Sequence, residues 1–241
     1  MRPFKMITQL SSAAALLVLG LTPVTALAAG PGTSSSNLTT VTTGYASDVT
    51  GSAEAQSNAQ FTVAPGALTL NSVPNILLSS TGVQNIATAD TTLNVNNGNT
   101  NGGEAYDGNG SGKLDVSDYR GNHAGWTLTV GMGPFTSGPA TVNSATLNLT
   151  TNKGTVDNTA TAAPTALSLT QSTLTTGWVT SPQTIWAAPV NTGEGDNSAT
   201  TATSSSLVVG KQPTISSGTY SATLYWALQD APTAAPATTQ P

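Results

Sequence analysis

The sequence predicts an all-β fold, and three observations carry this prediction. Apolar residues recur at every second position in several short segments, as on strands with one buried face. Threonine, whose β-branched side chain suits a pleated surface, is abundant throughout the chain. No window of a dozen residues shows the three- and four-residue apolar spacing of an amphipathic helix. We therefore expect a single two-sheet sandwich or jelly-roll-like domain with long loops rich in Gly, Asn and Thr.

The 241-residue chain begins with a segment typical of a secretory signal peptide. Arg2 and Lys5 form a positive start, an apolar run covers residues 13–21, and residues 26–28 (Ala-Leu-Ala) supply a small-x-small cleavage pattern. The apolar run is too short to span a bilayer. We expect a signal peptide over residues 1–28, a secreted protein, and no membrane span in the mature chain.

Composition divides the remainder into three parts. Residues 29–59 are rich in Ser, Thr and Gly and contain almost no large apolar side chains, so we expect a flexible leader. Residues 60–232 carry the alternating segments and form the expected β domain. Residues 233–241 are a short tail rich in Pro, Ala and Thr.

The expected strands follow one another through this β domain. Four short segments place alternate apolar side chains on one face, namely residues 61–63, 68–70, 145–149 and 167–169. The strongest pattern covers residues 220–228, where every even-numbered residue is apolar. Residues 96–111 are rich in Asn and Gly, and we expect them to form a long exposed loop.

The composition excludes several classes of function. Only 7% of the residues are charged, cysteine is absent and His123 is the one histidine, which excludes thiol chemistry, disulfides and multi-histidine metal sites. After loss of the signal peptide, four cations remain against eleven acidic residues, a net charge of −7 that disfavours nucleic-acid binding. The chain contains no Gly-x-Ser-x-Gly nucleophile elbow and no aromatic cleft signature around its carboxylates. We expect no enzymatic activity, no cofactor and no metal.

Two Trp-x-Leu motifs lie a hundred residues apart in the expected β domain. The first, Trp126 to Leu128, follows an Asp-x-Arg pair at residues 118–120. The second, Trp226 to Leu228, precedes an Asp-x-Pro sequence at residues 230–232. In both motifs the tryptophan and the leucine share one face of the expected strand.

With these motifs the sequence resembles the WxL-domain surface proteins of Gram-positive bacteria. Leu68-Thr-Leu70 followed by Val73-Pro74 adds to the resemblance, while Asn75-Ile76 stands where the family has Phe-Gly and Ala227 stands where threonine is common. The resemblance implies a secreted cell-surface protein held non-covalently at the cell wall, with peptidoglycan as the ligand. It equally implies the alternative of a module that docks onto a membrane-anchored WxL-interacting protein, and onto other WxL proteins, without contacting glycan.

The candidate binding residues are those of the motifs, and their role has two interpretations. The tryptophans can fill the core beside their leucines, or they can present a surface for sugar rings or a protein partner. The Asp-x-Arg pair can be a structural ion pair, or its arginine can orient a carboxylate ligand. The candidates are Trp126, Leu128, Trp226, Leu228, Asp118 and Arg120.

Two other features have more than one interpretation. Residues 107–118 place oxygen-bearing side chains at the positions of an EF-hand-type calcium loop, but we expect a solvated turn because neither flank is helical. Trp178 and Trp186 suit either core packing or an interface, and the sequence does not choose between these roles.

Overall fold

The computed structural model describes residues 57–96 and 112–230. The chain divides into two units, residues 1–63 and residues 64–241. In the first unit, residues 57–63 form neither helix nor strand, and Phe61 and Val63 are exposed. The prediction of a strand at residues 61–63 is therefore wrong.

Several expectations lie outside the described residues. These are the signal peptide at residues 1–28, nearly all of the leader at 29–59, the tail at 233–241 and the loop over residues 97–111. Within the described ranges, no helix has the length and apolar character needed to cross a membrane.

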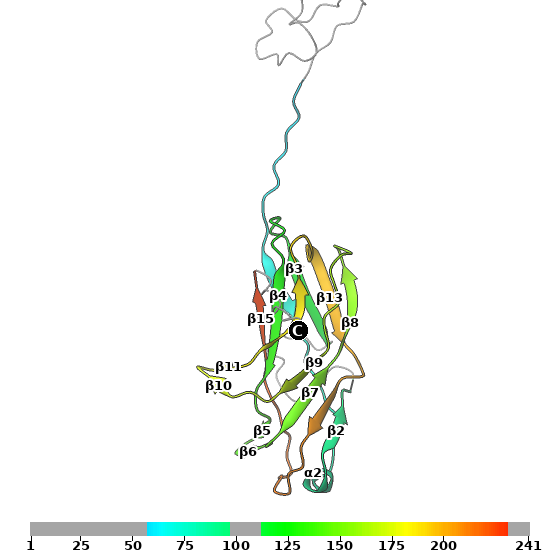
Figure 1. The fold of residues 1–241 in the computed structure, drawn as a ribbon, viewed down its shortest axis with the longest axis vertical. Coiled ribbons are helices and arrows are strands. Elements are labelled where there is room, and N and C mark those ends of the chain that lie inside the picture. Colours follow the sequence, from blue (N-terminus) through cyan, green and yellow to red (C-terminus); the bar gives the residue numbers. More distant parts are fainter. Residues whose placement is uncertain (1–56, 97–111, 231–241) are drawn as a thin grey trace, which may run out of the picture. The chain divides into compact units, whose positions relative to one another are not determined.

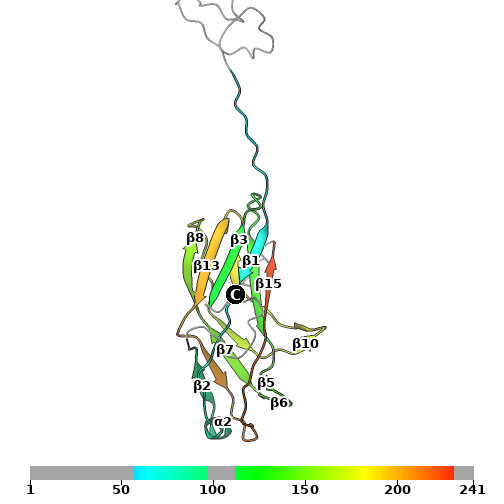
Figure 2. The same ribbon diagram turned by 180° about the vertical axis from the view of Figure 1, so that it is seen from behind.

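The second unit confirms the all-β prediction, since antiparallel sheets make up its regular structure with almost no helix. One sheet, which we call the β3 sheet, lines the side of the unit seen in Figure 2. Its strands in spatial order are β1 (Leu68–Ser72), β3 (Lys113–Asp118), β13 (Gly195–Thr201) and β8 (Thr151–Val156). Leu114 and Val116 of β3 are fully buried, which fixes the inner face of this sheet.

The second sheet, the β4 sheet, contains both Trp-x-Leu motifs. Its spatial order is β12 (Gln183–Ala188), β4 (Trp126–Met132) and β15 (Leu224–Gln229), with β4 in the centre. Trp126, Leu128, Val130 and Met132 alternate along β4 and are all fully buried. Because side chains alternate between the faces of a strand, these four define the inner face of the sheet.

The third sheet, the β7 sheet, confirms the strands expected at residues 145–149 and 167–169. Its spatial order is β2 (Thr91–Asn94), β14 (Ser206–Val209), β7 (Ala145–Leu149) and β9 (Leu167–Thr170). Buried and partly exposed residues alternate strictly along β7 and β14, as on a sheet with one face in the core.

The short elements were not predicted from the sequence. They are the helix α2 (Val83–Thr88), the hairpin of β5 (Thr136–Ser137) and β6 (Ala140–Thr141), and the hairpin of β10 (Leu174–Thr175) and β11 (Trp178–Val179). The β10–β11 hairpin projects sideways from the unit in Figures 1 and 2. Strands of two residues are too short to show an apolar alternation, so periodicity could not reveal them.

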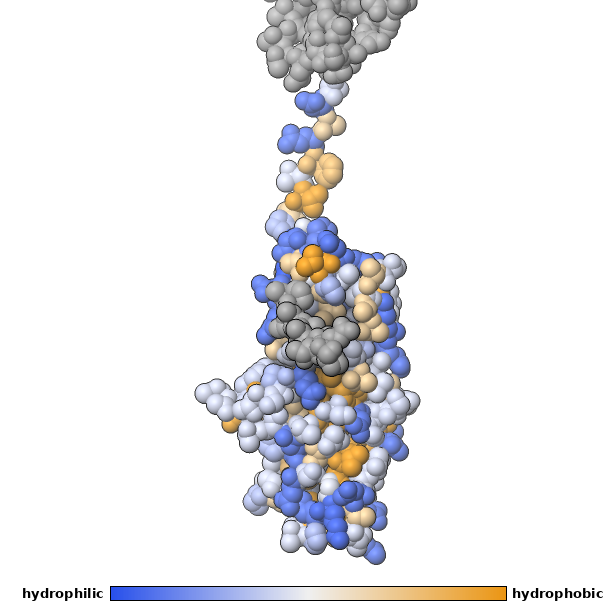
Figure 3. Space-filling view, in the orientation of Figure 1, coloured by the Kyte–Doolittle hydropathy of each residue, from blue (hydrophilic) through white to orange (hydrophobic). Residues whose placement is uncertain are grey.

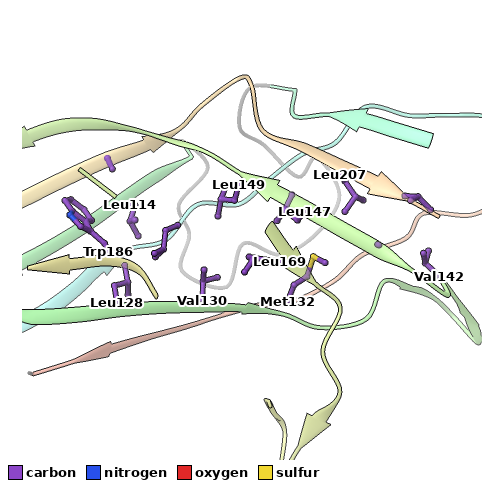
Figure 4. Packing of buried hydrophobic residues seen from close by; sticks show 14 of the residues in the cluster. Leu114, Leu128, Val130, Met132, Val142, Leu147, Leu149, Leu169, Trp186 and Leu207 are labelled. Atoms are coloured by element: carbon purple, nitrogen blue, oxygen red, sulfur yellow. The ribbon is translucent and has the colours of Figure 1, made fainter. Parts of the chain in front are cut away.

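One hydrophobic core joins the three sheets. Figure 4 shows the side chains of Leu128, Val130 and Met132 on the side of β4 that faces Leu147 and Leu149 of β7. The β4 sheet thus packs across both other sheets as one layer of a sandwich. Its inner face carries the motif residues, and on its opposite face Thr127 is also fully buried, whereas Tyr225 is partly exposed.

Candidate functional site

The two Trp-x-Leu strands are direct neighbours in the sheet. In the antiparallel register of β4 and β15, Leu128 lies opposite Leu228 and Val130 lies opposite Trp226. Residues opposite each other on adjacent strands share a face, so both motifs point toward the core. Two segments a hundred residues apart therefore form one ladder, and each depends on the other for its register.

The first motif lies completely inside the molecule. The Trp126 side chain has no exposed surface, and its indole Nε1 donates a hydrogen bond to the Gly193 carbonyl oxygen at 3.1 Å. Its ring meets that of Trp186 edge to face, with centroids 5.2 Å apart and planes at 79°. Trp186, whose role the sequence does not decide, is thus a core residue. A buried indole with its donor satisfied is a stable arrangement.

Two glycines beside this motif allow close packing, Gly193 against the indole ring and Gly125 against the backbone of residues 188–189. Gly193 has a φ of +83°, and a Cβ atom there would lie 2.5 Å from Trp126 Nε1 and would overlap the Ala188 side chain. Gly125, directly before the motif, has a φ of +75°, and a Cβ atom there would lie 2.8 Å from the Pro189 carbonyl carbon. Both positions need a residue without Cβ in the left-handed region.

The second motif is less deeply placed, because β15 is an edge strand of its sheet. Trp226 and Leu228 are partly buried and pack against the core cluster. The register of β15 puts them on the same face as the fully buried residues of β4. The pattern over residues 220–228 therefore predicted the inner face correctly, although the continuous strand begins only at Leu224.

The Asp-x-Arg pair forms an ion pair that is largely buried. Arg120 Nε donates to Asp118 Oδ1 at 2.9 Å and Arg120 Nη2 donates to Asp118 Oδ2 at 2.8 Å, a bidentate arrangement. The Asp118 side chain is 3% exposed and the Arg120 side chain is 14% exposed. The hydrogen bonds from Arg120 hold the pKa of Asp118 below its usual value, and burial opposes this shift only in part.

The same guanidinium also joins three strands. Its Nη2 donates to the Gly125 carbonyl oxygen at 2.7 Å, at the start of β4, and its Nη1 donates to the Asp230 carbonyl oxygen at 2.9 Å, just after β15. Asp118 itself ends β3. Arg120 therefore holds the ends of both motif strands beside the β3 sheet, through four hydrogen bonds to acceptors of this chain.

A group of polar side chains lies near this ion pair. Ser117 donates to Asp196 at 2.5 Å, and this hydrogen bond, followed by one from Tyr119, lowers the pKa of Asp196. Burial raises the pKa of Glu194, but hydrogen bonds from Asn158 and His123 outweigh it, so that this pKa is also lowered. The His123 Nδ1 to Glu194 Oε1 distance is 2.9 Å. The carboxylates of Asp196 and Glu194 are therefore both hydrogen-bonded by other side chains of this protein.

The calcium-like loop is described only in its second half. Residues 107–111 lie outside the described residues, whereas residues 113–118 form β3 in the interior of its sheet. Of the two carboxylates in that half, Asp115 pairs with Lys113 and Asp118 pairs with Arg120. In the described parts of the chain, no group of three or more His, Cys, Asp or Glu side chains is arranged to hold a metal ion.

A second set of residues lies at the outer face of the β4 sheet; the sequence left Trp178 between core packing and an interface and did not single out the other two. We define the aromatic patch as Leu174, Trp178 and Tyr225. The Trp178 and Tyr225 rings meet edge to face, with centroids 5.1 Å apart and planes at 71°. Leu174 and Trp178 are each 44% exposed. A Thr-Gly pair at residues 176–177, between two short strand-forming pairs, is the one sequence signal that could have indicated this hairpin.

Fold and motif geometry together define an all-β sandwich in which two Trp-x-Leu strands pair side by side. The family model described as WxL domain, surface cell wall-binding, matches residues 33–232. No curated protein and no solved structure matches the chain. Because the family match covers most of the sequence, this chain belongs to the WxL family. It is a surface protein with a cell-wall-binding domain, and the description of the family names binding rather than catalysis.

Proposed function

We propose that this protein is secreted by a Gram-positive cell and held non-covalently at the cell wall by direct contact between its WxL domain and peptidoglycan. The observation that carries the proposal is the family match over residues 33–232, on a chain whose two motif strands are paired in one sheet. Removal of the expected signal peptide gives the mature chain, in which the β sandwich is the wall-bound part.

We further propose that the motif residues serve binding by fixing the fold. Trp126 and Leu128 are fully buried, and Trp226 and Leu228 pack against the same core. Asp118 and Arg120 engage each other and hold the ends of β4 and β15. These six residues therefore keep the β4 sheet in register, so that its outer face has a defined shape for a ligand.

The charge of the molecule bears on how it is retained. Cell walls carry many anionic groups, and a mature chain with four cations against eleven acidic residues gains little from long-range attraction to them. Retention then depends on apolar contacts and hydrogen bonds at short range. Such contacts depend little on ionic strength, which shortens the Debye length from about 10 Å at 0.1 M to about 3 Å at 1 M.

The test is co-sedimentation of the purified mature protein with peptidoglycan stripped of proteins and teichoic acids, across about 0.1 to 1 M NaCl. We expect the protein to sediment with the peptidoglycan and the bound fraction to change by less than about twofold over this range. Release by moderate salt would contradict short-range contact. Binding only when a membrane-anchored partner protein is added would replace direct peptidoglycan binding with the docking alternative.

A further inference from the structure

We propose that the aromatic patch of Leu174, Trp178 and Tyr225 is the glycan-contact site of this domain, where sugar rings of an uncharged glycan backbone stack on Trp178. This inference rests on the proposed wall binding and gives it a location. It assigns the ligand contact to the outer face of the β4 sheet, opposite the face that carries the Trp-x-Leu side chains.

The exposure of the tryptophans distinguishes this patch from the motifs. Of the four tryptophans, Trp126 and Trp186 are buried and Trp226 is partly buried in the core cluster. Trp178 alone among them is exposed, to 44%. A pyranose ring has an apolar face of C–H groups, which an accessible indole ring can cover. Trp178 is therefore the one tryptophan of the chain that is exposed enough to stack on a sugar ring.

The strands against which the patch packs fix its position. Tyr225 lies opposite Gly131 in the β4–β15 register, on the face away from the core. A Cβ atom at Gly131 would lie 2.5 Å from Val179 Cγ2, so the absence of a side chain there lets β11 lie directly on β4. Trp178, the residue before Val179, then contacts Tyr225. The motif strands thereby support the exposed Trp178 ring and the partly exposed Tyr225 ring.

The turn before Trp178 adds a further constraint. Thr176 and Gly177 have φ values of +53° and +79°, and a two-residue type I′ hairpin turn requires positive φ at both central positions. A β-branched residue is strained in the left-handed region. Strain of this kind gathers at functional sites, where the surrounding structure maintains it. Here it accompanies the hairpin that presents Trp178.

The charge distribution favours an uncharged glycan as the occupant. The three strands of the β4 sheet and the whole segment from residue 172 to residue 193 contain no charged residue. The β3 sheet, by contrast, carries Lys113, Asp115, Asp118, Lys153 and Asp196. In Figure 3 the projecting hairpin is pale, without the deep blue of strongly polar residues. The carboxylates that lie on described strands, Asp115, Asp118 and Asp196, are thus all on the β3 sheet.

The hydroxyl groups around the patch and its small size also favour a glycan as the ligand. Thr173, Thr175, Thr176 and Thr180 lie on or beside the hairpin, and the hydroxyls of Thr173 and Thr180 are 3.4 Å apart. Threonine hydroxyls both donate and accept hydrogen bonds, as sugar hydroxyls require. A stable protein interface buries about 800 Å² on each partner, more than three side chains supply. One or two sugar rings suit a patch of this size.

The experiment uses the mature chain with three samples: cell walls that retain their proteins, peptidoglycan stripped of proteins and teichoic acids, and soluble glycan strands freed of their stem peptides by an amidase. Trp178→Ala and Tyr225→Ala are compared with the wild type and with Tyr119→Ala, which removes an exposed aromatic ring from the end of the β3 sheet. We expect Trp178→Ala to weaken binding to the glycan strands about tenfold or more, as removal of a central aromatic anchor does. Tyr119→Ala should bind as the wild type does.

Tryptophan fluorescence supplies a second measurement that does not depend on truncation. Glycan strands should change the emission of the wild type through Trp178, and this change should disappear in Trp178→Phe, which retains a ring and the fold. Thermal unfolding and near-UV circular dichroism confirm that each variant is folded before binding is compared.

The outcomes separate this inference from the proposed function. If the wild type binds peptidoglycan and both patch variants bind equally well, the patch is not the site and wall binding stands. If the wild type binds intact peptidoglycan but not the peptide-free strands, the ligand is not the glycan. If the patch variants lose binding only to walls that retain their proteins, the patch recognises a protein. If the wild type binds no peptidoglycan, both proposals fail.

Discussion

At the scale of single residues, the position of Gly193 decides how closely the chain packs around Trp126. Its carbonyl oxygen accepts the indole hydrogen bond, and the space where its side chain would be is filled by Trp126 and Ala188. Gly193→Ala should lower the free energy of unfolding by about 2 to 4 kcal/mol, because overpacking adds to the strain of a left-handed alanine. Urea unfolding measures this loss.

Gly121→Ala is the matched control for this substitution. Gly121 has a φ of +69°, but a Cβ atom there would meet no heavy atom within 4 Å. The control therefore carries the left-handed strain alone, about 1 kcal/mol. Equal losses in the two variants would show that close packing against Trp126 contributes nothing.

The ion pair of Asp118 and Arg120 predicts a dependence of stability on pH. The pKa of Asp118 is lower in the folded state than its usual value, so the charged carboxylate stabilises the fold at pH values above that usual value. This contribution is lost as the pH falls through the folded-state pKa. Asp118→Asn should reduce the free energy of unfolding by about 2 to 4 kcal/mol at pH 7, since it leaves the buried guanidinium without its partner.

The difference between Asp118→Asn and the wild type should shrink as the pH falls below about 4, where the carboxylate of the unfolded chain takes up a proton, and it should be lost as the pH falls through the lower folded-state pKa of Asp118. Glu194 and Asp196 also have lowered pKa values, so both proteins should still lose stability in acid. Asp230→Asn is the control, because it removes only the weaker charge attraction of Asp230 for Arg120 and retains the backbone carbonyl that accepts the hydrogen bond. A difference that stays constant from pH 7 to pH 3 would contradict this account.

At the scale of elements, the turn of the β10–β11 hairpin offers a test of backbone strain. Thr176→Asn places in the left-handed region a residue that tolerates it, as the Asn-Gly preference of type I′ turns shows. The substitution should raise the free energy of unfolding by about 0.5 to 1 kcal/mol. Thr175→Asn, one residue earlier within β10, should bring no such gain. A loss of stability in Thr176→Asn would show that Thr176 is held by its side chain instead.

The alternation of apolar residues predicted those elements whose one face lies in the core. It gave β1, β7 and β9 and the inner faces of β4 and β15, because each of these strands is long enough to repeat the pattern and has a core to meet. The same pattern misled at residues 61–63, where Phe61 and Val63 are exposed. Two alternating apolar residues show only that a segment is able to form a strand. It forms one only where a neighbouring strand pairs with it.

The roles of the tryptophans could be predicted only in part. Trp126 and Trp226 share the face of their leucines, which indicated a common environment, but the sequence did not say whether that face met core or ligand. Trp178 and Trp186 have similar neighbours in sequence, Gly-Trp-Val and Ile-Trp-Ala, yet one is exposed and the other buried. Pairing between distant strands decides this difference, since β12 lies beside β4 while β11 belongs to a projecting hairpin.

At the scale of the whole molecule, the β4 sheet separates stability from binding. Its inner face carries the motif tryptophan Trp126 in the core, and its outer face supports Trp178 at the surface. Substitutions on the two faces should therefore affect different properties. A change at the core tryptophan lowers the folded fraction, whereas a change at the surface tryptophan lowers the affinity of molecules that are folded.

Trp126→Ala tests this separation, because it removes one of the two largest side chains of the core together with its hydrogen bond to Gly193. It should lower the free energy of unfolding by about 3 to 5 kcal/mol, and Trp226→Ala, whose side chain is only partly buried, by about 2 kcal/mol. Peptidoglycan binding by Trp126→Ala should follow the folded fraction as temperature is varied, while Trp178→Ala should stay folded and lose binding. A folded Trp126→Ala protein that no longer binds would instead give the motif a role in the contact itself, since the loss could not come from unfolding.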